Sequence, residues 1–438
     1  MPISKPKGTY DVLPSDVWKW NRLEGTIKKV CKLYNFQEVR TPIFESSELF
    51  HRTVGETSDL VKKETYDFTD RGGRMNTLRP EGTAGVARAY IENKMYADGS
   101  VQKLYYMGPM FRYERQQKGR YRQFSQFGVE AIGSNSPLMD VEVILFAATT
   151  LRALGLKGVK VKINSIGDEE SRDRYREALV EYFSQYQDDL CGDCKLRLEK
   201  NPLRILDCKV DNKKEYFANA PKISDYLNET SKEHFNKVIE ALKEVGLPYE
   251  INPNLVRGLD YYCHTVFELE AEIEGFGSQN VLGGGGRYDK LVSDLEGPKT
   301  PCVGMAFGMD RLILAMEAEG LLKNNNEYIH LYLISLGDKA RVVAERLLYT
   351  MRLGGLMCEA DYQNKGLKGQ FKQADKYNAK FTAILGDSEL ENFVINVKNN
   401  ETDEQETIGL NDLYKHIISY MQSKTQSPCS TCNKKEGE

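Results

Sequence analysis

The alternation of side chains along residues 122–132 (RQFSQFGVEAI) constrains the fold more than any other part of this sequence. Successive side chains of a β-strand point to opposite faces of its sheet. This strand therefore has an apolar face and a polar face, formed by Phe127, Val129 and Ala131 and, on the other side, by Gln126, Gly128 and Glu130. The amide of Gln126, the missing side chain of Gly128 and the carboxylate of Glu130 suit a ligand cleft better than a core. We expect a sheet with helices on one face and a cleft on the other.

Segments on either side of this strand predict the rest of its domain. A helix is predicted over residues 15–35, whose apolar residues recur at three- and four-residue steps, and another over 138–156. Further strands are predicted at residues 101–107, 259–269 and 302–307. Strands joined by hairpin-like loops, with helices grouped elsewhere, indicate an α+β domain on an antiparallel sheet. We expect this domain to span residues 1–323.

Three further segments differ in pattern. Residues 170–249 are charged and helical in pattern, and we expect them to form a helical insertion within the first domain. Residues 328–422 alternate strands and helices, which predicts a separate small α/β domain with a largely parallel sheet. The polar tail at 423–438 is expected to be disordered.

Composition excludes several classes of protein. The chain has 438 residues with 60 Lys+Arg and 64 Asp+Glu, which gives a net charge of −4. The protein as a whole therefore does not attract nucleic acid, and a polyanion would have to bind at a local basic cluster. No apolar run approaches the roughly 18–20 residues of a membrane span, and the start has no signal-peptide centre. Nine cysteines, an odd number, indicate reduced thiols and a cytoplasmic protein that uses no membrane. GxxxxGK[ST], HExxH and GxSxG motifs are all absent.

Two clusters carry candidate chemistry. The loop before the 122–132 strand is basic, with Arg112, Arg115, Lys118, Arg120 and Arg122. By composition alone, a solvated hairpin tip is an equally good interpretation. In the second cluster, residues 303–312, a short apolar strand runs through a glycine into a helix whose first turn holds Arg311. Helix N-termini attract anions, and an arginine there strengthens such a site, although an arginine at this position is usually just a surface residue.

These motifs resemble those of a known family. Arg112, the basic loop and FGVE resemble motif 2 of class II aminoacyl-tRNA synthetases, GMAFGMDRL resembles motif 3, and TPIFESSELF resembles motif 1, the dimer interface of that family. RGLDYYCHTVFE at 257–268 and GGGGRYDKL at 283–291 resemble the two histidine-specific signatures of the histidyl-tRNA synthetases, and LRPEGTAGVAR at 78–88 matches as well. The resemblance covers nearly the whole chain. It implies a class II catalytic domain and a C-terminal anticodon-binding domain.

The resemblance implies a ligase that activates L-histidine with ATP to histidyl-adenylate and pyrophosphate, and then transfers the histidyl group to the 3′ end of tRNA. Attack of a carboxylate on the α-phosphate joins two anions, so fixed cations should dominate catalysis. By family analogy Arg112 and Arg257 are the catalytic residues at the α-phosphate. Glu114 and Arg311 join Arg112 in binding ATP, with Arg311 at the γ-phosphate.

The same resemblance assigns the histidine pocket. Glu130 and Tyr262 would meet the two imidazole nitrogens, while Arg257 meets the histidine carboxylate. The α-ammonium group would be held by Glu81, Thr83 and Gln126. Tyr261 and Tyr288 would line the pocket, although for Tyr288 ordinary packing is an equally good interpretation.

One geometric condition bears on this assignment. Arg257 and Tyr262 are five residues apart, so a regular strand would send their side chains to opposite faces. We therefore expect either a bulge at Gly258 or an Arg257 that lies in the loop before the strand. A single unbroken strand over residues 257–262 would contradict the joint assignment.

The implied ligands and partners are ATP as a substrate, Mg²⁺ as its counter-ion, L-histidine, a second copy of the chain in a homodimer, and tRNA. The tRNA would meet the 113–122 loop at its acceptor end and the C-terminal domain at its anticodon. We assign no residue to a protein-held metal. Two CxxC pairs, Cys191/Cys194 and Cys429/Cys432, leave zinc open, and Cys208 lies near the first pair.

Three alternatives remain at this stage. One is a catalytically inactive paralogue that regulates histidine biosynthesis, a second is a tRNA-binding sensor without chemistry, and a third is another class II synthetase. The presence of Arg112, Arg257 and Arg311 disfavours the first two, and RGLDYY disfavours the third. Histidine-dependent ATP–pyrophosphate exchange separates all of them.

Overall fold

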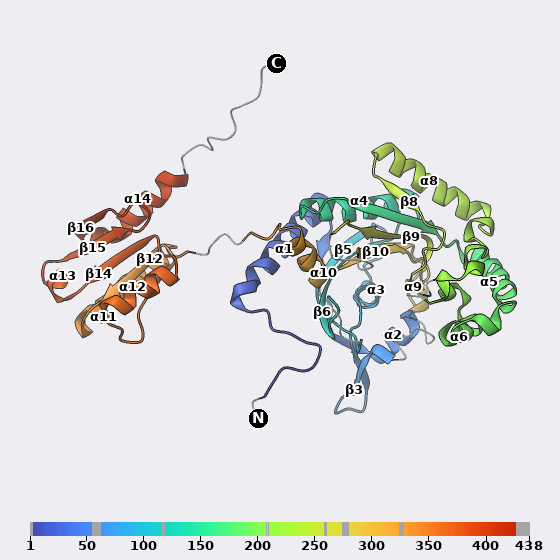
Figure 1. The fold of residues 1–438 in the computed structure, drawn as a ribbon, viewed down its shortest axis with the longest axis horizontal. Helices are drawn as coiled ribbons and strands as arrows, with labels where there is room; N and C mark the ends of the chain where they lie inside the picture. The colour runs from blue at the N-terminus through green and yellow to red at the C-terminus, as the bar shows by residue number, and fades with distance from the viewer. Residues whose placement is uncertain are drawn as a thin grey trace, which may run out of the picture. The chain divides into compact units, whose positions relative to one another are not determined.

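The structure is a computed structural model that describes residues 3–54, 63–114, 119–206, 208, 210–257, 261–273, 280–323 and 328–425. The chain divides into two compact units, Met1–Leu322 and Lys323–Glu438 (Figure 1). Among the described helices, none is both long enough and apolar enough to cross a membrane.

An eight-stranded sheet organises the first unit. Its strand order is β1-β5-β6-β11-β10-β9-β7-β8, and every pairing is antiparallel except β1–β5 and β7–β8 at the two edges. The strands are β1 (Gln37–Glu38), β5 (Gln102–Phe111), β6 (Gln123–Ile132), β7 (Lys160–Ser165), β8 (Tyr249–Ile251), β9 (Cys263–Glu270), β10 (Val281–Arg287) and β11 (Cys302–Gly308). The predicted antiparallel sheet is confirmed.

Helices cover the apolar face of this sheet. They are α1 (Pro14–Leu33), α4 (Pro137–Ala153), α8 (Glu229–Val245) and α10 (Met309–Ala318). α4 is rich in apolar residues, most of which are buried, and it begins at Pro137, with the Ser136 hydroxyl accepting a hydrogen bond from the Leu138 N–H, as is typical of a capped helix. α8 is capped by Asn228 and ends at Gly246, whose φ of +73° suits glycine.

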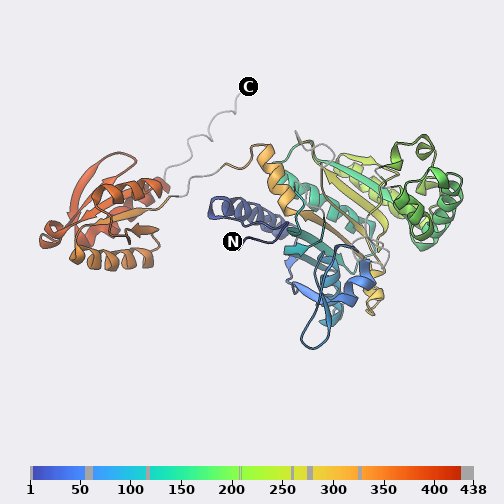
Figure 2. The same cartoon turned by 60° about the horizontal axis from the view of Figure 1, so that its bottom comes forward.

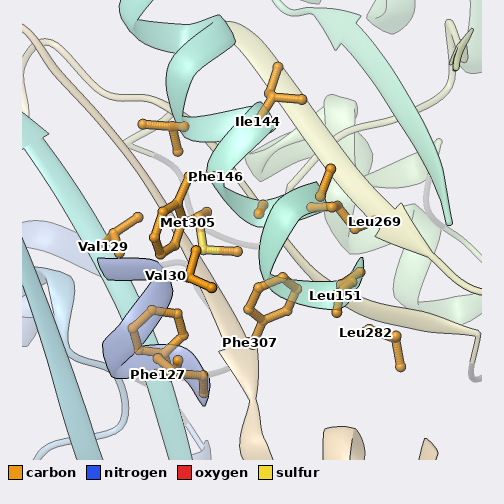
Figure 3. Packing of buried hydrophobic residues seen from close by; sticks show 14 of the residues in the cluster. Val30, Phe127, Val129, Ile144, Phe146, Leu151, Leu269, Leu282, Met305 and Phe307 are labelled. Atoms are coloured by element: carbon orange, nitrogen blue, oxygen red, sulfur yellow. The ribbon is translucent and has the colours of Figure 1, made fainter. Parts of the chain in front are cut away.

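The core between these layers confirms the side-chain parity predicted for residues 122–132. Phe127 and Val129 of β6 are fully buried, and Figure 3 shows them with Phe307 of β11 packed toward Phe146 of α4 and Val30 of α1. The opposite face of β6 is thereby left for polar side chains.

The glycine run at 283–286 forms a strand that the sequence analysis did not predict. β10 lies between β9 and β11 and pairs with both. Glycine has low strand propensity, so tertiary pairing overrides the local preference here.

The remaining elements of the first unit lie around the sheet. A small antiparallel sheet is formed by β2 (Phe44–Ser46), β3 (Tyr66–Thr69) and β4 (Met75–Leu78). α2 (Ser47–Val54), α3 (Thr83–Glu92) and α9 (Leu291–Asp294) complete this part of the unit. Between β7 and β8 the chain forms α5 (Glu169–Ser184), α6 (Gly192–Lys200), α7 (Glu215–Ala218) and α8. Figure 2 shows the green helices of this insertion gathered at one end of the unit.

The second unit is built on a five-stranded sheet of order β13-β12-β14-β15-β16. β12 (Leu331–Ser335) pairs in parallel with β13 (Cys358–Ala360) and β14 (Phe381–Leu385), whereas β15 (Val394–Asn399) and β16 (Gln405–Gly409) pair antiparallel. The prediction of a largely parallel sheet is therefore wrong for half of the pairings, because β15 runs antiparallel to β14 and is followed by β16, a strand that the sequence did not predict. The helices are α11 (Asp338–Leu353), α12 (Leu367–Lys376), α13 (Asp387–Glu391) and α14 (Leu413–Thr425).

Candidate active site

A cavity of about 350 Å³ opens on the polar face of the large sheet. Its floor is formed by β6, β11 and β10, and segments next to β5, α3, β9 and α10 supply its walls. All eleven residues that the sequence analysis assigned to the site line it, namely Glu81, Thr83, Arg112, Glu114, Gln126, Glu130, Arg257, Tyr261, Tyr262, Tyr288 and Arg311. The structure thus brings them together, whereas their individual roles remain predictions.

Glu130 lies at the acidic end of the cavity and is 1% exposed. Its Oε1 accepts a hydrogen bond of 2.7 Å from the Thr83 hydroxyl, and its Oε2 accepts one from the Tyr288 hydroxyl. Burial raises the pKa of Glu130 to about 8, against these two hydrogen bonds, which lower it, and the nearby Glu81 carboxylate raises it further. The pocket therefore holds a carboxyl group that changes charge near neutral pH.

Glu81 is buried beside this group and caps a helix. Its two carboxylate oxygens accept hydrogen bonds from the backbone N–H groups of Thr83 and Ala84, at 2.6 and 2.8 Å, at the start of α3. Burial raises the pKa of Glu81 above its ordinary value despite those bonds. Each oxygen retains a lone pair, so capping does not exclude a ligand.

Three tyrosines close the acidic end. Tyr261 lies with its ring centroid 4.7 Å from that of Tyr262 and 5.4 Å from that of Tyr288. The hydroxyl of Tyr288 is committed to Glu130. Tyr288 is therefore both a packed core residue and part of the pocket, so the two interpretations offered by the sequence are compatible.

The second end of the cavity is basic. Arg112, directly after β5, donates from Nε to the Pro80 carbonyl at 2.9 Å and stacks over the Phe124 ring. Arg120 lies 3.4 Å from the Glu114 carboxylate, which also faces Arg112. Arg311 occupies the first turn of α10, as predicted, and donates to the Val281 carbonyl. Burial and the neighbouring Arg120 lower the pKa of Arg311 below its ordinary value, so an anion bound here would be favoured.

Arg257 lies between the two ends. It precedes β9, which begins only at Cys263, so Arg257 and Tyr262 do not share a strand, as expected for an Arg257 that lies before it. Arg257 donates from Nη1 to Glu268 at 2.6 Å, and its Cζ lies 6.0 Å from the Tyr262 ring centroid. Gly258, proposed as a bulge, lies outside the described residues.

Glycines on β10 and β11 leave the space that the side chains of Glu130, Arg257 and Tyr262 occupy. A Cβ on Gly304, which pairs with Glu130 across β11 and β6, would stand 1.8 Å from Glu130 Oε2. On β10 a Cβ at Gly284 would meet Arg257 Nη1 at 2.9 Å, and one at Gly286 would meet the Tyr262 ring at 2.9 Å. The glycine strand is the surface across which the larger side chains lie.

Three buried polar atoms of the cavity lack protein partners. Within the part of the chain that the structure describes, the Tyr106 hydroxyl, Gln126 Oε1 and Arg257 Nε have no hydrogen-bond partner. Buried polar groups are normally paired, so these atoms indicate ligand-binding positions.

Several cavity residues were not assigned to the site from the sequence. Arg120 was recognised only as part of the basic loop, and Tyr106, Tyr121 and Phe124 were not singled out at all. The strand order could have indicated Tyr106 and Phe124, because β5 and β6 are neighbours. Arg115 and Lys118 of the loop lie outside the described residues.

Sequence relatives of this chain agree with one another. A family model described as histidyl-tRNA synthetase matches residues 8–167 and 197–312, and one described as anticodon binding domain matches residues 330–420. The histidine–tRNA ligase of Bacillus cytotoxicus is 52% identical over 418 residues, which cover 95% of this chain and 99% of that protein. The histidine–tRNA ligase of Geobacillus sp. is 51% identical at the same coverage.

Solved structures of similar proteins share the fold of this chain. The apo histidyl-tRNA synthetase of S. aureus matches with a TM-score of 0.81 and 44% identity, over 95% of this chain and 100% of that chain. A Bacillus halodurans protein described as an ATP phosphoribosyltransferase regulatory subunit/histidyl-tRNA synthetase is 22% identical, with a TM-score of 0.62 over 88% of this chain and 99% of that chain. It shares the fold.

The absence of a side chain at position 304 is testable. We expect Gly304→Ala to destabilise the protein by about 1–3 kcal/mol, because the new methyl group forces the Glu130 carboxyl out of its place. Gly25→Ala is the matched control: no atom lies within 4 Å of a Cβ there, in the middle of α1, so alanine should stabilise by about 0.5–1 kcal/mol. Urea unfolding of both variants measures the difference, and equal stabilities would contradict the packing of Glu130 against Gly304.

Proposed function

The chain belongs to the histidyl-tRNA synthetase family, and we propose that the cavity residues described above divide its reaction among them as follows. The function is that of a histidine–tRNA ligase, which activates L-histidine with ATP and transfers the histidyl group to tRNA. The observation that supports this division of roles is a single cavity lined by Arg112, Arg257, Arg311 and Glu130.

In the first step an oxygen of the histidine carboxylate attacks the α-phosphorus of ATP and pyrophosphate leaves. Negative charge concentrates on the α-phosphate in the transition state, so donors fixed in advance are worth most there. We assign Arg112 and Arg257 to the α-phosphate from two sides, with Arg257 also at the histidine carboxylate. Arg311 is assigned to the γ-phosphate.

Glu114 completes the ATP site in this proposal. Its carboxylate lies between Arg112 and Arg120 in the cavity wall. Carboxylate oxygen is a ligand type that Mg²⁺ accepts alongside phosphates, so Glu114 fits a magnesium ion held mainly by ATP. When bound, the ion would neutralise part of the charge on the phosphates.

Histidine recognition is assigned to the acidic end. The ionised Glu130 would accept the imidazole N–H, and the Tyr262 hydroxyl would donate to the other ring nitrogen. Glu81, Thr83 and Gln126 would hold the α-ammonium group, for which the partnerless Gln126 Oε1 is a suitable acceptor. An apolar analogue would leave these buried groups unpaired, which can reject it by about 10⁴–10⁵.

In the second step a hydroxyl of the tRNA 3′ end attacks the histidyl carbonyl, and AMP leaves. We propose that the loop at 113–122 contacts the acceptor end, where Arg120 and Arg122 are the described cations. The second unit, which matches the anticodon binding domain, would read the anticodon. The proposed location is the cytoplasm, where tRNA and ATP are available; cell fractionation would test it.

We expect Arg257→Ala to lower histidine-dependent ATP–pyrophosphate exchange by about 10²–10³, the usual effect of removing one fixed donor from a transition state. Binding of tRNA, measured by filter binding, should be retained because Arg257 lines the cavity and is not part of the 113–122 loop or of the second unit. Arg174→Ala is the control, since that arginine is about half exposed on α5 and outside the cavity. Near-normal exchange in Arg257→Ala would contradict the assignment, and no exchange with the unaltered chain would contradict the function itself.

We expect histidine to bind more tightly as the pH rises from about 6.5 to 8. Glu130, with a pKa raised to about 8, is mostly protonated in the empty pocket at neutral pH. A carboxyl that must ionise to accept the imidazole N–H releases a proton on binding, so affinity rises by up to about tenfold per pH unit below that pKa and levels off above it.

Calorimetry in buffers of different ionisation enthalpy measures this proton release. Glu130→Gln should bind histidine weakly and lose the rise in affinity between pH 6.5 and 8. This variant keeps Glu81, the other buried carboxyl group nearby, so any rise that remained would have to come from a group other than Glu130. Affinity that is flat or falls with pH in the unaltered chain would refute the ionised partner.

Exposed apolar side chains on the small three-stranded sheet support a homodimer. Ile43, Phe44, Phe68 and Met75 are between 40% and 53% exposed, and Ile43 and Phe44 lie in the segment that resembles motif 1. We expect the full chain to sediment as a dimer and Phe44→Glu to shift it toward the monomer, because a buried unpaired charge is costly at an interface. Phe393→Glu, an exposed phenylalanine of the second unit, should stay dimeric. A monomeric unaltered chain would contradict the proposal.

A further inference from the structure

Four metal-ligand side chains converge in the helical insertion, away from the active-site cavity. Cys191, Cys194, Cys208 and Asp211 each offer one ligand atom, and these four atoms all lie within 4.8 Å of one another. Cys194 and Asp211 are fully buried and Cys208 is nearly so. None of the four lines the active-site cavity. We propose that these residues form a structural zinc site.

The separation of the sulfur atoms fits a tetrahedral ion. The Sγ atoms of Cys191 and Cys208 lie 3.7 Å apart. Two thiolates bound to one tetrahedral zinc at about 2.3 Å stand about 3.8 Å apart, whereas a disulfide bond is about 2.05 Å long. The two cysteines are thus spaced as ligands of a common ion.

The local chain holds the ligands in two pairs of equal spacing. Cys191 directly precedes α6 and Cys194 lies in its first turn, while Cys208 and Asp211 are likewise separated by two residues. The backbone links the pairs, because the Cys191 N–H donates to the Asp211 carboxylate at 3.0 Å and the Asp211 N–H donates to Cys208 Sγ at 3.3 Å. Backbone hydrogen bonds to ligand atoms, such as these two, hold metal ligands in a fixed orientation.

The donor set and its charge select zinc. Soft thiolates disfavour Mg²⁺ and Ca²⁺, and iron–sulfur clusters ordinarily take cysteine at all four positions. Three thiolates and a carboxylate carry more negative charge than Zn²⁺ neutralises. Lys214, whose Nζ lies 2.8 Å from Asp211 Oδ1, offsets part of the excess.

The surrounding segment is of the kind that a metal stabilises. Between α5 and α8 the described residues form short helices and turns with no strand, around a small cluster that includes Leu190, Leu198 and Ile205. Small, loop-rich modules commonly depend on a metal or a disulfide because their cores are too small. A tetrahedral ion would join α6 to Cys208 and Asp211.

The sequence left this site open because it offered only three nearby ligands. The second CxxC pair, Cys429 and Cys432, lies outside the described part of the chain. The structure places Asp211 as the fourth ligand, within the insertion itself.

Metal analysis of the full, untagged chain tests the proposal. After reduction, incubation with zinc and gel filtration, mass spectrometry of the metal should give about one zinc ion per chain. Replacement by Co²⁺ should give thiolate-to-cobalt charge-transfer bands and the intense visible bands of a tetrahedral site. Cys194→Ser and Cys208→Ser should lose the ion and these bands.

Two further variants make the result specific. Asp211→Cys should keep the ion and strengthen the charge-transfer band, a gain that a merely structural aspartate would not give. The double variant Cys429→Ser, Cys432→Ser removes the other CxxC pair of the chain and should keep the ion.

Other results overturn the proposal. One is an unaltered chain that is folded by circular dichroism and binds neither zinc nor cobalt. A second is zinc retained at full stoichiometry in Cys194→Ser and Cys208→Ser, or lost only in the Cys429/Cys432 variant. A third is a Cys191–Cys208 disulfide, found by mass after purification without reductant, in a chain that binds no metal once reduced.

Discussion

The cleft depends on one steric constraint, namely the room that glycine leaves on β10 and β11. Glu130 occupies the space above Gly304, while Arg257 and Tyr262 lie over Gly284 and Gly286. With a Cβ at any of these glycines, the side chain above it would be displaced from the sheet. The convergence of a carboxyl, a guanidinium and a phenol on one floor is thus a property of the backbone, and the glycines keep that backbone free of side chains.

The two ends of the cavity differ in the charge of the side chains that line them. Glu130 is held by neutral donors, Thr83 and Tyr288, which explains why burial dominates and its pKa rises. Arg120 and Arg311 meet at the other end with Glu114 as the nearby carboxylate, so positive charge remains in excess there. A ligand with an imidazole at one end and a triphosphate at the other matches this division, since each charged end finds its complement.

The sequence predicted the parts of the molecule in which the local residue pattern matches the packing in the fold. The parity of Phe127 and Glu130 fixed both faces of β6, and all eleven assigned residues reach one cavity. Most of those assignments came from the family resemblance, since spacing alone could not place Arg257 beside Tyr262. β10 was missed because glycine has a low strand propensity. β16 was missed because its first three residues are polar and exposed, so the sequence there shows no alternation of apolar and polar residues. Asp211 was missed because an aspartate three residues after a cysteine has no distinctive pattern.

The insertion contacts residues of the active-site cavity as well as forming its own fold. Arg172 of α5 donates to the Tyr262 backbone carbonyl at 2.7 Å. Asn201 and Leu203, which follow α6, share a cavity of about 80 Å³ with Arg257 and Tyr262. Arg257 and Tyr262 therefore lie against glycines of the sheet on one side and beside the insertion on the other. An ion that fixes α6 would bear on the position of Arg257 through these contacts, and the role proposed for this guanidinium requires a position that is set before the substrate arrives.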